Sequence, residues 1–229
     1  MNAAAANRTP SPPPRPRTLI PLIRHISRPV TLVLLRTPLT GNQATFLSLL
    51  FGIAAVYSFF PGGYGCGVLG GVLLFLNYVL DHCDGEIARA KGTTSPAGHA
   101  FDTFVDWVVH TALFATIGHG AMIDTGEAIW FWLGLTASTG STINYVLAVY
   151  WRRRNEGEGG AEPELGLENE TLKILLITAF REFARADFWL LVLVLALLDG
   201  MRYLLPFAAA GAQVYWVLQF LVRGRDRRV

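Results

Sequence analysis

The sequence predicts an all-α fold: a polytopic membrane protein with six transmembrane helices, preceded by an N-terminal amphipathic helix at the membrane interface. Three observations support this prediction. The 229 residues are 52% hydrophobic and only 16% charged, with a mean hydropathy of +0.38, whereas soluble domains carry about 25% charged residues. Six long apolar segments follow one another, and the basic residues gather in alternate connections between them. Such a composition argues against a cytosolic globule, a disordered chain and a nucleic-acid-binding domain.

The N-terminal region divides into two parts. Residues 1–17 are rich in proline and contain no apolar run, so they predict a disordered leader and no secretory signal peptide. Residues 18–37 are mainly apolar but include Arg24 and Arg28, which are four apart and share a helix face. This pattern predicts an interfacial amphipathic helix with its arginines toward anionic headgroups. Pro21 and Pro29 leave an extended arm as the alternative.

Residues 38–222 are predicted to form the six-helix transmembrane domain. The apolar segments are 44–60, 65–88, 99–122, 127–151, 186–199 and 201–222. A span needs about 20 mostly apolar residues, so the first segment is slightly short. The fifth is too short unless a helix from Thr171 continues into it. Residues 155–170 are predicted to be an acidic cytoplasmic loop, and residues 223–229 a basic cytoplasmic tail.

The basic residues agree with this count of spans. With a cytoplasmic N-terminus and six alternating helices, 18 of the 19 lysines and arginines fall on the cytoplasmic side and only Arg202 falls opposite. Membrane proteins show this bias when their topology is correctly assigned, so both termini are predicted to be cytoplasmic. Cys66 and Cys83 lie in apolar segments, which predicts two buried free thiols rather than a disulfide.

Four aspartates lie in two neighbouring apolar segments, where charged side chains are costly and mark functional sites. They are Asp81 and Asp84 in one segment and Asp102 and Asp106 in the next. At about 100° per residue, each pair falls on one side of its helix. The stretch 92–96 between them, GTTSP, suits a helix break. We therefore expect the four carboxylates to converge a turn or two below the cytoplasmic surface.

Four carboxylates in an apolar medium require protonation or bound cations. Oxygen ligands at this density suit Mg²⁺, Mn²⁺ or Ca²⁺ rather than zinc, and two such ions can clamp a diphosphate. Arg89 lies on the same face and can bind a phosphate, and Gly85 lets a bulky ligand approach the backbone. The structural alternative is that Asp81 and Asp84 cap a helix or pair with Arg89, and that Gly98 serves helix packing.

The pattern of this region resembles the signature of the class I CDP-alcohol phosphatidyltransferase family at every fixed position. The matching residues are Asp81-x2-Asp84-Gly85-x2-Ala88-Arg89-x8-Gly98-x3-Asp102-x3-Asp106. Residues 37–45 also resemble the family's segment entering the first span, but Gly41 stands where the family usually has proline, so we expect a looser turn before Asn42 and Thr45. Trp107 stands where many members carry an arginine after the last aspartate.

The resemblance implies that a CDP-linked donor (CDP-diacylglycerol or another CDP-alcohol) gives its substituted phosphoryl group to an alcohol hydroxyl and releases CMP, in phospholipid or related phosphodiester biosynthesis. It implies Mg²⁺ or Mn²⁺ in a two-metal site near the cytoplasmic face, with Asp106 also acting as general base. The implied metal ligands are Asp81, Asp84, Asp102 and Asp106, and the implied CDP-binding residues are Gly85, Ala88, Arg89 and Gly98. The implied partners are the donor, a small alcohol or phosphorylated-alcohol acceptor and membrane lipids, with no nucleic acid and with a homodimer left open.

The sequence identifies the alcohol acceptor less clearly than the CDP-linked donor. Arg152, Arg181 and Arg185 are candidate acceptor or phosphate contacts, but they equally suit the topology bias and lipid headgroups. Residues 84–89, DGEIAR, look closest to the branch of the family that joins CDP-inositol to inositol phosphate, which is the alternative substrate assignment. His82 and His99 are expected to point off the carboxylate faces, and His110 is interpreted as a packed residue.

Two other classes of membrane protein also carry acidic residues within apolar helices. An intramembrane prenyltransferase also uses aspartate-rich helices and Mg²⁺, but its motifs normally occur in two separated loops and lack the Gly-x2-Ala-Arg element. A cation transporter would favour broken helices near the midplane and often an internal repeat. The aspartates here cluster toward one face and no repeat is visible, which favours the transferase.

Overall fold

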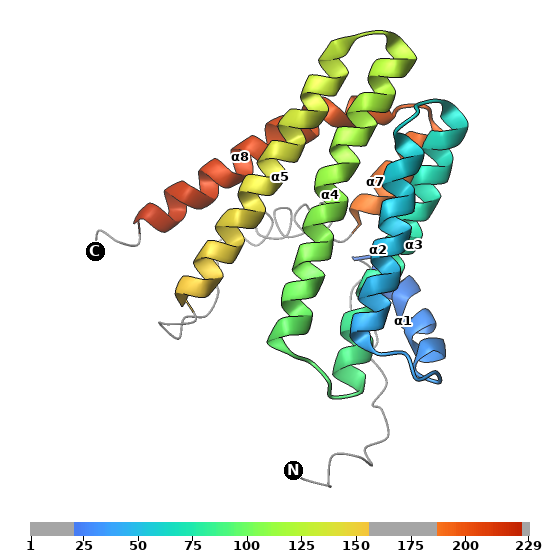
Figure 1. Cartoon of the computed structure of the whole chain (residues 1–229), viewed down its shortest axis with the longest axis vertical. Coiled ribbons are helices and arrows are strands. Elements are labelled where there is room, and N and C mark those ends of the chain that lie inside the picture. Colours follow the sequence, from blue (N-terminus) through green and yellow to red (C-terminus); the bar gives the residue numbers. More distant parts are fainter. Residues whose placement is uncertain (1–20, 156–186, 226–229) are drawn as a thin grey trace, which may run out of the picture.

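The computed structural model describes residues 21–155 and 187–225, with side chains for residues 21–151 and 187–217. The described part of the chain is helical throughout and contains no strand, in agreement with the predicted all-α class (Figure 1). Its elements are α1 (Ile23–Leu34), α2 (Gly41–Phe59), α3 (Tyr64–Ala90), α4 (Pro96–Thr125), α5 (Ala128–Asn155), α7 (Phe188–Leu197), the short 3₁₀ helix η2 (Met201–Tyr203) and α8 (Leu204–Arg225). The predicted leader, the acidic loop from residue 156 on and residues 226–229 lie outside the described residues.

Helix α2 is central to the half of the bundle that carries the aspartates. It packs against both α3 and α4, and those two helices pack far more on α2 than on each other. On the outside, α3 also contacts α1 and α7, while α4 packs on α5 and α5 on α8. Figure 1 shows α5 and α8 side by side, leaning away from α1, α2 and α3.

Helix α1 lies inside the predicted interfacial segment and is a helix despite Pro29. Its buried residues, Ile23, Ser27 and Thr31, are four apart and form one face, which packs on α3. The N-terminal turn is held by Asp187, whose fully buried carboxylate accepts hydrogen bonds from the backbone N–H groups of Leu22 (2.8 Å) and Ile23 (3.0 Å). Asp187 lies just before α7, so it ties the starts of two helices that are 165 residues apart in sequence.

Helix α2 begins at Gly41, three residues before the predicted first span. Thr40 and Gln43 form a reciprocal capping box, in which the Thr40 hydroxyl accepts from the Gln43 N–H and the Gln43 side chain accepts from the Thr40 N–H, so the first turn is well capped. A Cβ on Gly41 would lie 2.9 Å from the carbonyl oxygen of Asp84. The absence of a side chain therefore lets α2 approach the part of α3 that bears the aspartates.

The six-span count is only partly supported. Of the described helices, α2 and α3 are long and apolar enough to cross a membrane. Helix α7 has ten residues, or about 15 Å at 1.5 Å per residue, and the hydrocarbon core is about 30 Å thick. A helix that runs on without a break from Thr171 is not supported, because Asp187 (φ −108°, ψ 15°) is not helical and α7 begins at Phe188; the residues before Asp187 are not described. Both cysteines are free, as predicted, but only Cys83 is buried.

Helices α4 and α5 are both longer than α2. They pair polar residues along a seam that consists of Trp107 and Thr111 on α4 and Ser138, Ser141 and Thr142 on α5. The Trp107 indole N–H donates to the Thr142 hydroxyl (3.3 Å), the Thr111 hydroxyl to that of Ser141 (3.3 Å), and the Ser138 hydroxyl to the carbonyl of Thr111 (2.7 Å). The polar groups of the seam are therefore satisfied between the two helices.

Candidate active site

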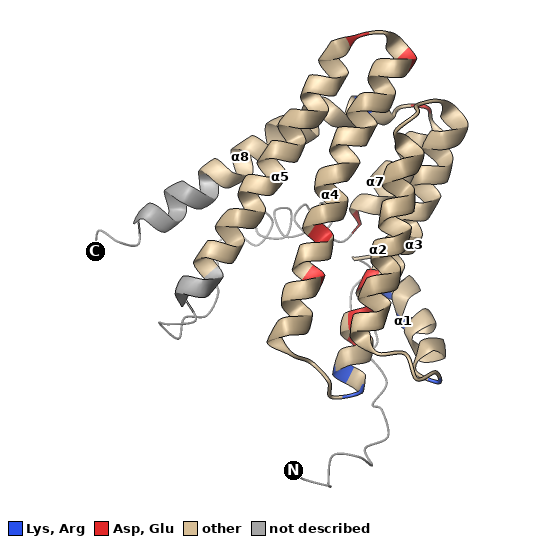
Figure 2. Cartoon of the chain, in the orientation of Figure 1, with Lys and Arg blue, Asp and Glu red and all other residues tan. Residues whose placement is uncertain are grey.

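The aspartates are placed by the end of α3, the start of α4 and the connection between them. Ser95 is the N-cap of α4, since its hydroxyl accepts from the N–H of Gly98 at 3.0 Å, and Pro96 occupies the first helical position, where its fixed φ is favourable. The tight connection reverses the chain, so the last turns of α3 and the first turns of α4 lie at the same end of the bundle. Figure 2 shows acidic residues on the lower parts of both helices.

Three of the four predicted carboxylates meet. One oxygen from each of Asp81, Asp102 and Asp106 lies within 4.8 Å of the other two. The Asp81 side chain is 19% exposed and that of Asp102 33%, whereas Asp106 is exposed. The Oδ1 atom of Asp81 is buried and has no hydrogen-bond donor within the described residues. Three adjacent carboxylates with an unsatisfied oxygen form a donor set that fits a hard divalent cation.

Asp84 lies beside this group rather than in it. It follows Asp81 by three residues, which turns it about 60° around α3, toward α2. There the Thr45 hydroxyl donates a short hydrogen bond to the Asp84 carboxylate, and both side chains are buried. Asp84 therefore has a fixed protein donor, in contrast to the open Oδ1 of Asp81.

A cavity of about 300 Å³ adjoins the carboxylates, between the starts of α2 and α4 and the end of α3. It contains every residue predicted to bind the CDP group. Its lining consists of Gly41, Asn42, Thr45, Asp84, Gly85, Ala88, Arg89, Thr93, Thr94, Ser95, Gly98, His99 and Asp102. A Cβ on Gly98 would lie 3.0 Å from Oδ1 of Asn42, so this glycine leaves room for the Asn42 side chain. The volume lies at the lower end of the range for small-molecule sites.

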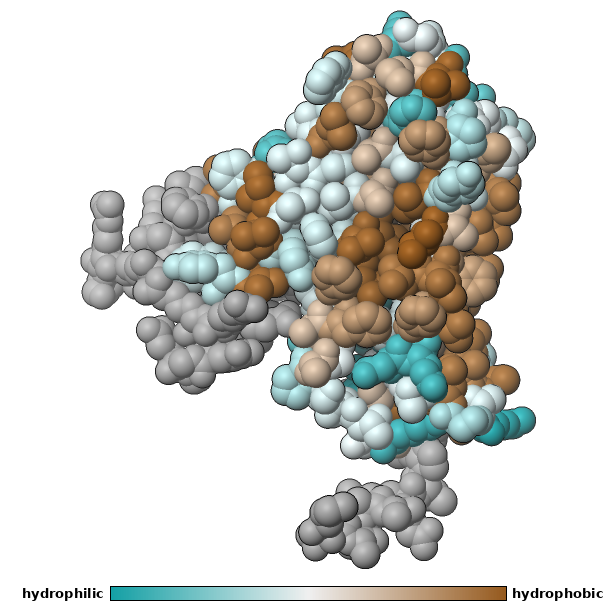
Figure 3. Space-filling view, in the orientation of Figure 1, coloured by the Kyte–Doolittle hydropathy of each residue, from teal (hydrophilic) through white to brown (hydrophobic). Residues whose placement is uncertain are grey.

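The surface around this end is polar, while the middle of the bundle is apolar. Figure 3 shows hydrophilic residues gathered at the lower end, below a belt of hydrophobic side chains. Exposed apolar residues on α2, such as Phe46, Leu50 and Ile53, belong to the apolar part of the surface. Arg89 is exposed and lines the cavity, where its guanidinium can meet an anionic ligand.

The histidines lie closer to the carboxylates than expected. The prediction that His82 and His99 point away was wrong, because Nδ1 of His82 lies 3.7 Å from Oδ2 of Asp81, and Nδ1 of His99 lies 3.9 Å from Oδ2 of Asp102. Helical angles alone missed these contacts because an imidazole is long enough to reach back toward a neighbouring side chain. His110 also contacts the site, through the backbone carbonyl oxygen of Asp106, which is 2.8 Å from its Nδ1.

The remaining predicted positions lie elsewhere. Trp107 packs toward α5, where its ring stacks on Tyr145 with centroids 4.8 Å apart, so this position contributes an aromatic packing residue. Arg152 falls in the last turn of α5, and its side chain lies outside the described residues, as do Arg181 and Arg185. The structure therefore does not test whether these arginines contact the acceptor.

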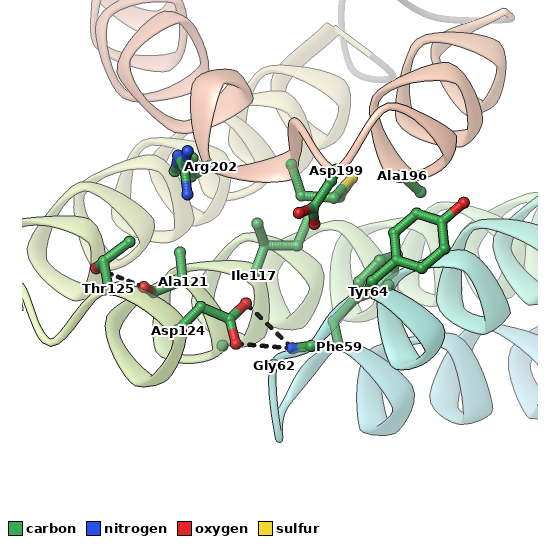
Figure 4. Close-up of a pocket in the computed structure, with 14 residues that line it drawn as sticks. Phe59, Gly62, Tyr64, Ile117, Ala121, Asp124, Thr125, Ala196, Asp199 and Arg202 are labelled. Carbon is green, nitrogen blue, oxygen red and sulfur yellow. Dashed lines mark hydrogen bonds between the residues drawn. The ribbon is translucent and has the colours of Figure 1, made fainter.

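A second cavity, of about 50 Å³, lies at the other end of the bundle (Figure 4). There the Asp124 carboxylate accepts two hydrogen bonds from the backbone N–H of Gly63, at 2.8 and 3.1 Å. Asp199 and Arg202 also line this cavity. It is far smaller than the cavity beside the aspartates, and Asp124 serves there to hold the turn between α2 and α3.

Several curated relatives match part of the chain. A bifunctional IPC transferase and DIPP synthase of Thermococcus kodakarensis is 31% identical over 123 residues, which cover 52% of this chain and 27% of that protein. An archaetidylinositol phosphate synthase of Pyrococcus horikoshii is 27% identical over 139 residues, which cover 61% of this chain and 67% of that protein. A second bifunctional protein, from Rubrobacter xylanophilus, is 35% identical and is also matched over 27% of its length. The chain thus spans about a quarter of the two bifunctional relatives.

A solved structure shares the fold. It is a phosphatidylinositol phosphate synthase of Mycobacterium tuberculosis with bound CDP-DAG, which has a TM-score of 0.56, 22% sequence identity and coverage of 86% of this chain and 92% of that one. The sequence model described as CDP-alcohol phosphatidyltransferase matches residues 39–198, which is more than half of the chain and includes all four aspartates. The chain belongs to the CDP-alcohol phosphatidyltransferase family.

Proposed function

We propose that this chain is an integral membrane, metal-dependent enzyme that transfers a substituted phosphoryl group from a CDP-linked donor to the hydroxyl of an alcohol and releases CMP. The observation that carries the proposal is the group formed by Asp81, Asp102 and Asp106 beside a cavity of about 300 Å³. That cavity is lined by Gly85, Ala88, Arg89 and Gly98, the residues expected to bind the CDP group. Family membership supports the same reaction and sets aside the prenyltransferase and transporter alternatives.

In the proposed mechanism, each group of residues has a separate task. Asp81, Asp102 and Asp106 would hold Mg²⁺ or Mn²⁺, with Asp84 beside them, and bound metal would neutralise the charge of the donor diphosphate. Arg89 would bind a phosphate oxygen, and the small residues of the cavity would let the nucleotide lie close to the backbone. Such reactions depend mainly on positioning and charge stabilisation.

Asp106 is the proposed general base. Its side chain is exposed, so an acceptor hydroxyl can approach it. The carboxylate takes the proton as the acceptor oxygen bonds to the phosphorus of the substituted phosphoryl group, and the bond from that phosphorus to the CMP oxygen breaks. A positioned base contributes about 10²–10⁴-fold to such a rate.

The substrates can be narrowed by the relatives. The Pyrococcus relative is an archaetidylinositol phosphate synthase, which favours a phosphorylated cyclitol as acceptor with CDP-diacylglycerol or a related lipid as donor. The alternative is CDP-inositol as donor and inositol phosphate as acceptor, favoured by residues 84–89. Arg152, Arg181 and Arg185 remain the proposed phosphate contacts for either acceptor.

For the topology, we propose six spans within residues 38–222, with both termini and the aspartates toward the cytoplasm. The bias of 18 of 19 basic residues toward one side supports this orientation. A fifth span requires that residues before Asp187 add to the length that the ten residues of α7 supply. A homodimer remains a prediction from the resemblance, to be measured by the mass of the purified protein in detergent.

The function is tested by CMP release. Purified protein with Mg²⁺ or Mn²⁺ should release CMP from CDP-diacylglycerol or CDP-inositol in the presence of an alcohol acceptor, and Asp106→Asn should lower this rate at least 10²-fold. Asp124→Asn is the matched control, because Asp124 lies on the same helix at the other end of the bundle and retains an acceptor oxygen for Gly63. Failure of the wild-type protein to release CMP from any CDP-linked donor would overturn the proposal.

A further inference from the structure

The helices that carry the three carboxylates have little direct contact with each other. Helices α3 and α4 both pack on α2, while Asp81 on α3 faces Asp102 and Asp106 on α4. Like charges this close repel each other, and the repulsion is strong where water is partly excluded. Packing on α2 holds each helix from one side, and a contact that joins α3 directly to α4 at this level would add to the force that keeps them together against this repulsion.

One such contact lies a turn away from the carboxylates. Tyr78, three residues before Asp81, places its hydroxyl 2.7 Å from Nε2 of His110, four residues after Asp106. Nδ1 of His110 lies 2.8 Å from the backbone carbonyl oxygen of Asp106. A carbonyl oxygen only accepts hydrogen bonds, so Nδ1 carries a proton; in the neutral imidazole Nε2 is then the acceptor and the Tyr78 hydroxyl donates. The chain of hydrogen bonds thus runs from α3 to the main chain of Asp106.

The surroundings hold both partners in place. Tyr78 is 4% exposed, and a buried hydroxyl of this kind needs a partner. Its ring lies beside that of His82, whose Nδ1 is 3.0 Å from the Tyr78 carbonyl oxygen. On the other side, Phe188 at the start of α7 packs on the His110 ring, with centroids 6.2 Å apart. The bond from Tyr78 to His110 is therefore set within packed side chains.

We propose that Tyr78 and His110 are a positioning pair for the transfer reaction: their hydrogen bond sets the spacing between α3 and α4 at which Asp81, Asp102 and Asp106 hold a divalent cation, and it orients the turn of α4 that carries Asp106. The inference rests on the proposed function, and neither residue is assigned a contact with substrate. Hydrogen bonds that orient metal ligands typically contribute 10–100-fold to metal affinity.

The test measures Mn²⁺ affinity by calorimetry together with CMP release. Tyr78→Phe removes only the hydroxyl and should weaken Mn²⁺ binding about 10–100-fold, with a parallel fall in CMP release. His110→Asn keeps a donor near the Asp106 carbonyl but is too short to reach Tyr78, and should give a similar loss. Because both changes break the same bond, the double variant should lose little more than either single variant.

Conservative rescue separates positioning from general packing. His110→Gln places an amide oxygen near the position of Nε2, where it can accept from Tyr78, so it should recover much of the Mn²⁺ affinity that His110→Asn loses. Tyr57→Phe is the matched control, since it deletes the same hydroxyl from a side chain on α2 that is 79% exposed, and it should bind Mn²⁺ like the wild type. This rescue still tests the proposal if Tyr78→Phe does not fold.

Any of three results would overturn the positioning role. Tyr78→Phe could bind Mn²⁺ as tightly as the wild type, the losses of affinity could multiply in the double variant, or His110→Asn and His110→Gln could lose equal affinity. The proposed function fails separately, by absence of CMP release from the wild-type protein. In that case the Mn²⁺ titrations alone still decide whether the pair sets the geometry of the carboxylates.

Discussion

At the scale of single residues, Thr45 supplies the contact that fixes Asp84. Its hydroxyl is buried between α2 and α3 and donates to the Asp84 carboxylate, while the carbonyl of Gly41 lies 3.2 Å away. Asp84 is thus held on the α2 side of the cavity, next to the residues expected to meet the nucleotide. The orientation of a carboxylate beside a metal site depends on such donors.

Thr45→Val should therefore weaken Mn²⁺ binding about 10–100-fold, because valine has the shape of threonine without the hydroxyl. Thr45→Ser restores the donor and should recover most of the affinity. The matched control is Thr116→Val, since Thr116 on α4 donates only to carbonyls of its own helix. Calorimetric titration of the purified variants measures the effect, and an unchanged affinity in Thr45→Val would show that Asp84 does not need this donor.

The aspartate site could be predicted from sequence where it depends on local helix geometry. A spacing of four residues brings Asp102 and Asp106 to one face, and the structure places them together with Asp81. The contacts of Asp84 with Thr45 and of Tyr78 with His110 join residues 39 and 32 positions apart. They depend on how α2, α3 and α4 pack, which the local spacing of residues does not specify.

At the scale of elements, α1 is attached at two points. Asp187 holds its first turn, and Ser27 in the middle of the helix donates a hydrogen bond to Oε1 of Glu86 on α3 at 3.1 Å. The position of this helix was predicted by its apolar residues and arginines. Its tie to α7 was not, because Asp187 looks like an ordinary polar residue before an apolar segment. The first N–H groups of a helix have no acceptor within the helix. Only the fold shows that the Asp187 carboxylate accepts hydrogen bonds from these groups in the first turn of α1.

Asp187→Ala should detach this turn, with a loss of about 1.5–3 kcal/mol for each hydrogen bond to a charged acceptor. Asp187→Asn retains one acceptor oxygen and should have a smaller effect.

Trypsin cleavage after the exposed Arg24 reports the detachment, and it should be fastest in Asp187→Ala. Asp124→Ala removes another carboxylate that accepts from a backbone N–H, at the far end of the bundle, and should leave this cleavage unchanged. Equal cleavage in Asp187→Ala and the wild type would contradict the role of Asp187.

At the scale of the whole molecule, the two ends of the bundle differ in chemistry. One end carries the aspartates and the larger cavity, and the other carries the turns after α2 and α4 and the small cavity of Figure 4. Under the proposed topology the first end faces the cytoplasm. The sequence predicted the positions of the long helices closely, but α7 has only ten residues, and its continuation falls in residues that are not described.

Cysteine labelling tests this orientation. In a background of Cys66→Ala and Cys83→Ala, a cysteine introduced as Thr94→Cys should react with an impermeant maleimide only from the cytoplasmic side, and Glu127→Cys only from the opposite side. Both positions are exposed and lie at opposite ends of the bundle. Labelling of the two positions from the same side would rule out the proposed topology.

Under the proposed topology, the polar seam between α4 and α5 has a consequence for insertion into the membrane. The Ser138 and Thr142 hydroxyls also donate to carbonyl oxygens within α5. The Trp107 indole N–H, however, finds its partner Thr142 only across the seam, and in α4 alone it would face lipid without a partner, which is costly. The link between them is only residues 126–127. A chain that stops after Thr125 should therefore leave α4 accessible to protease from both sides of the membrane, while one that continues through Asn155 should be protected. During biogenesis, α4 would then stay at the translocation machinery until α5 has been synthesised. The two helices would enter the bilayer together as one hairpin.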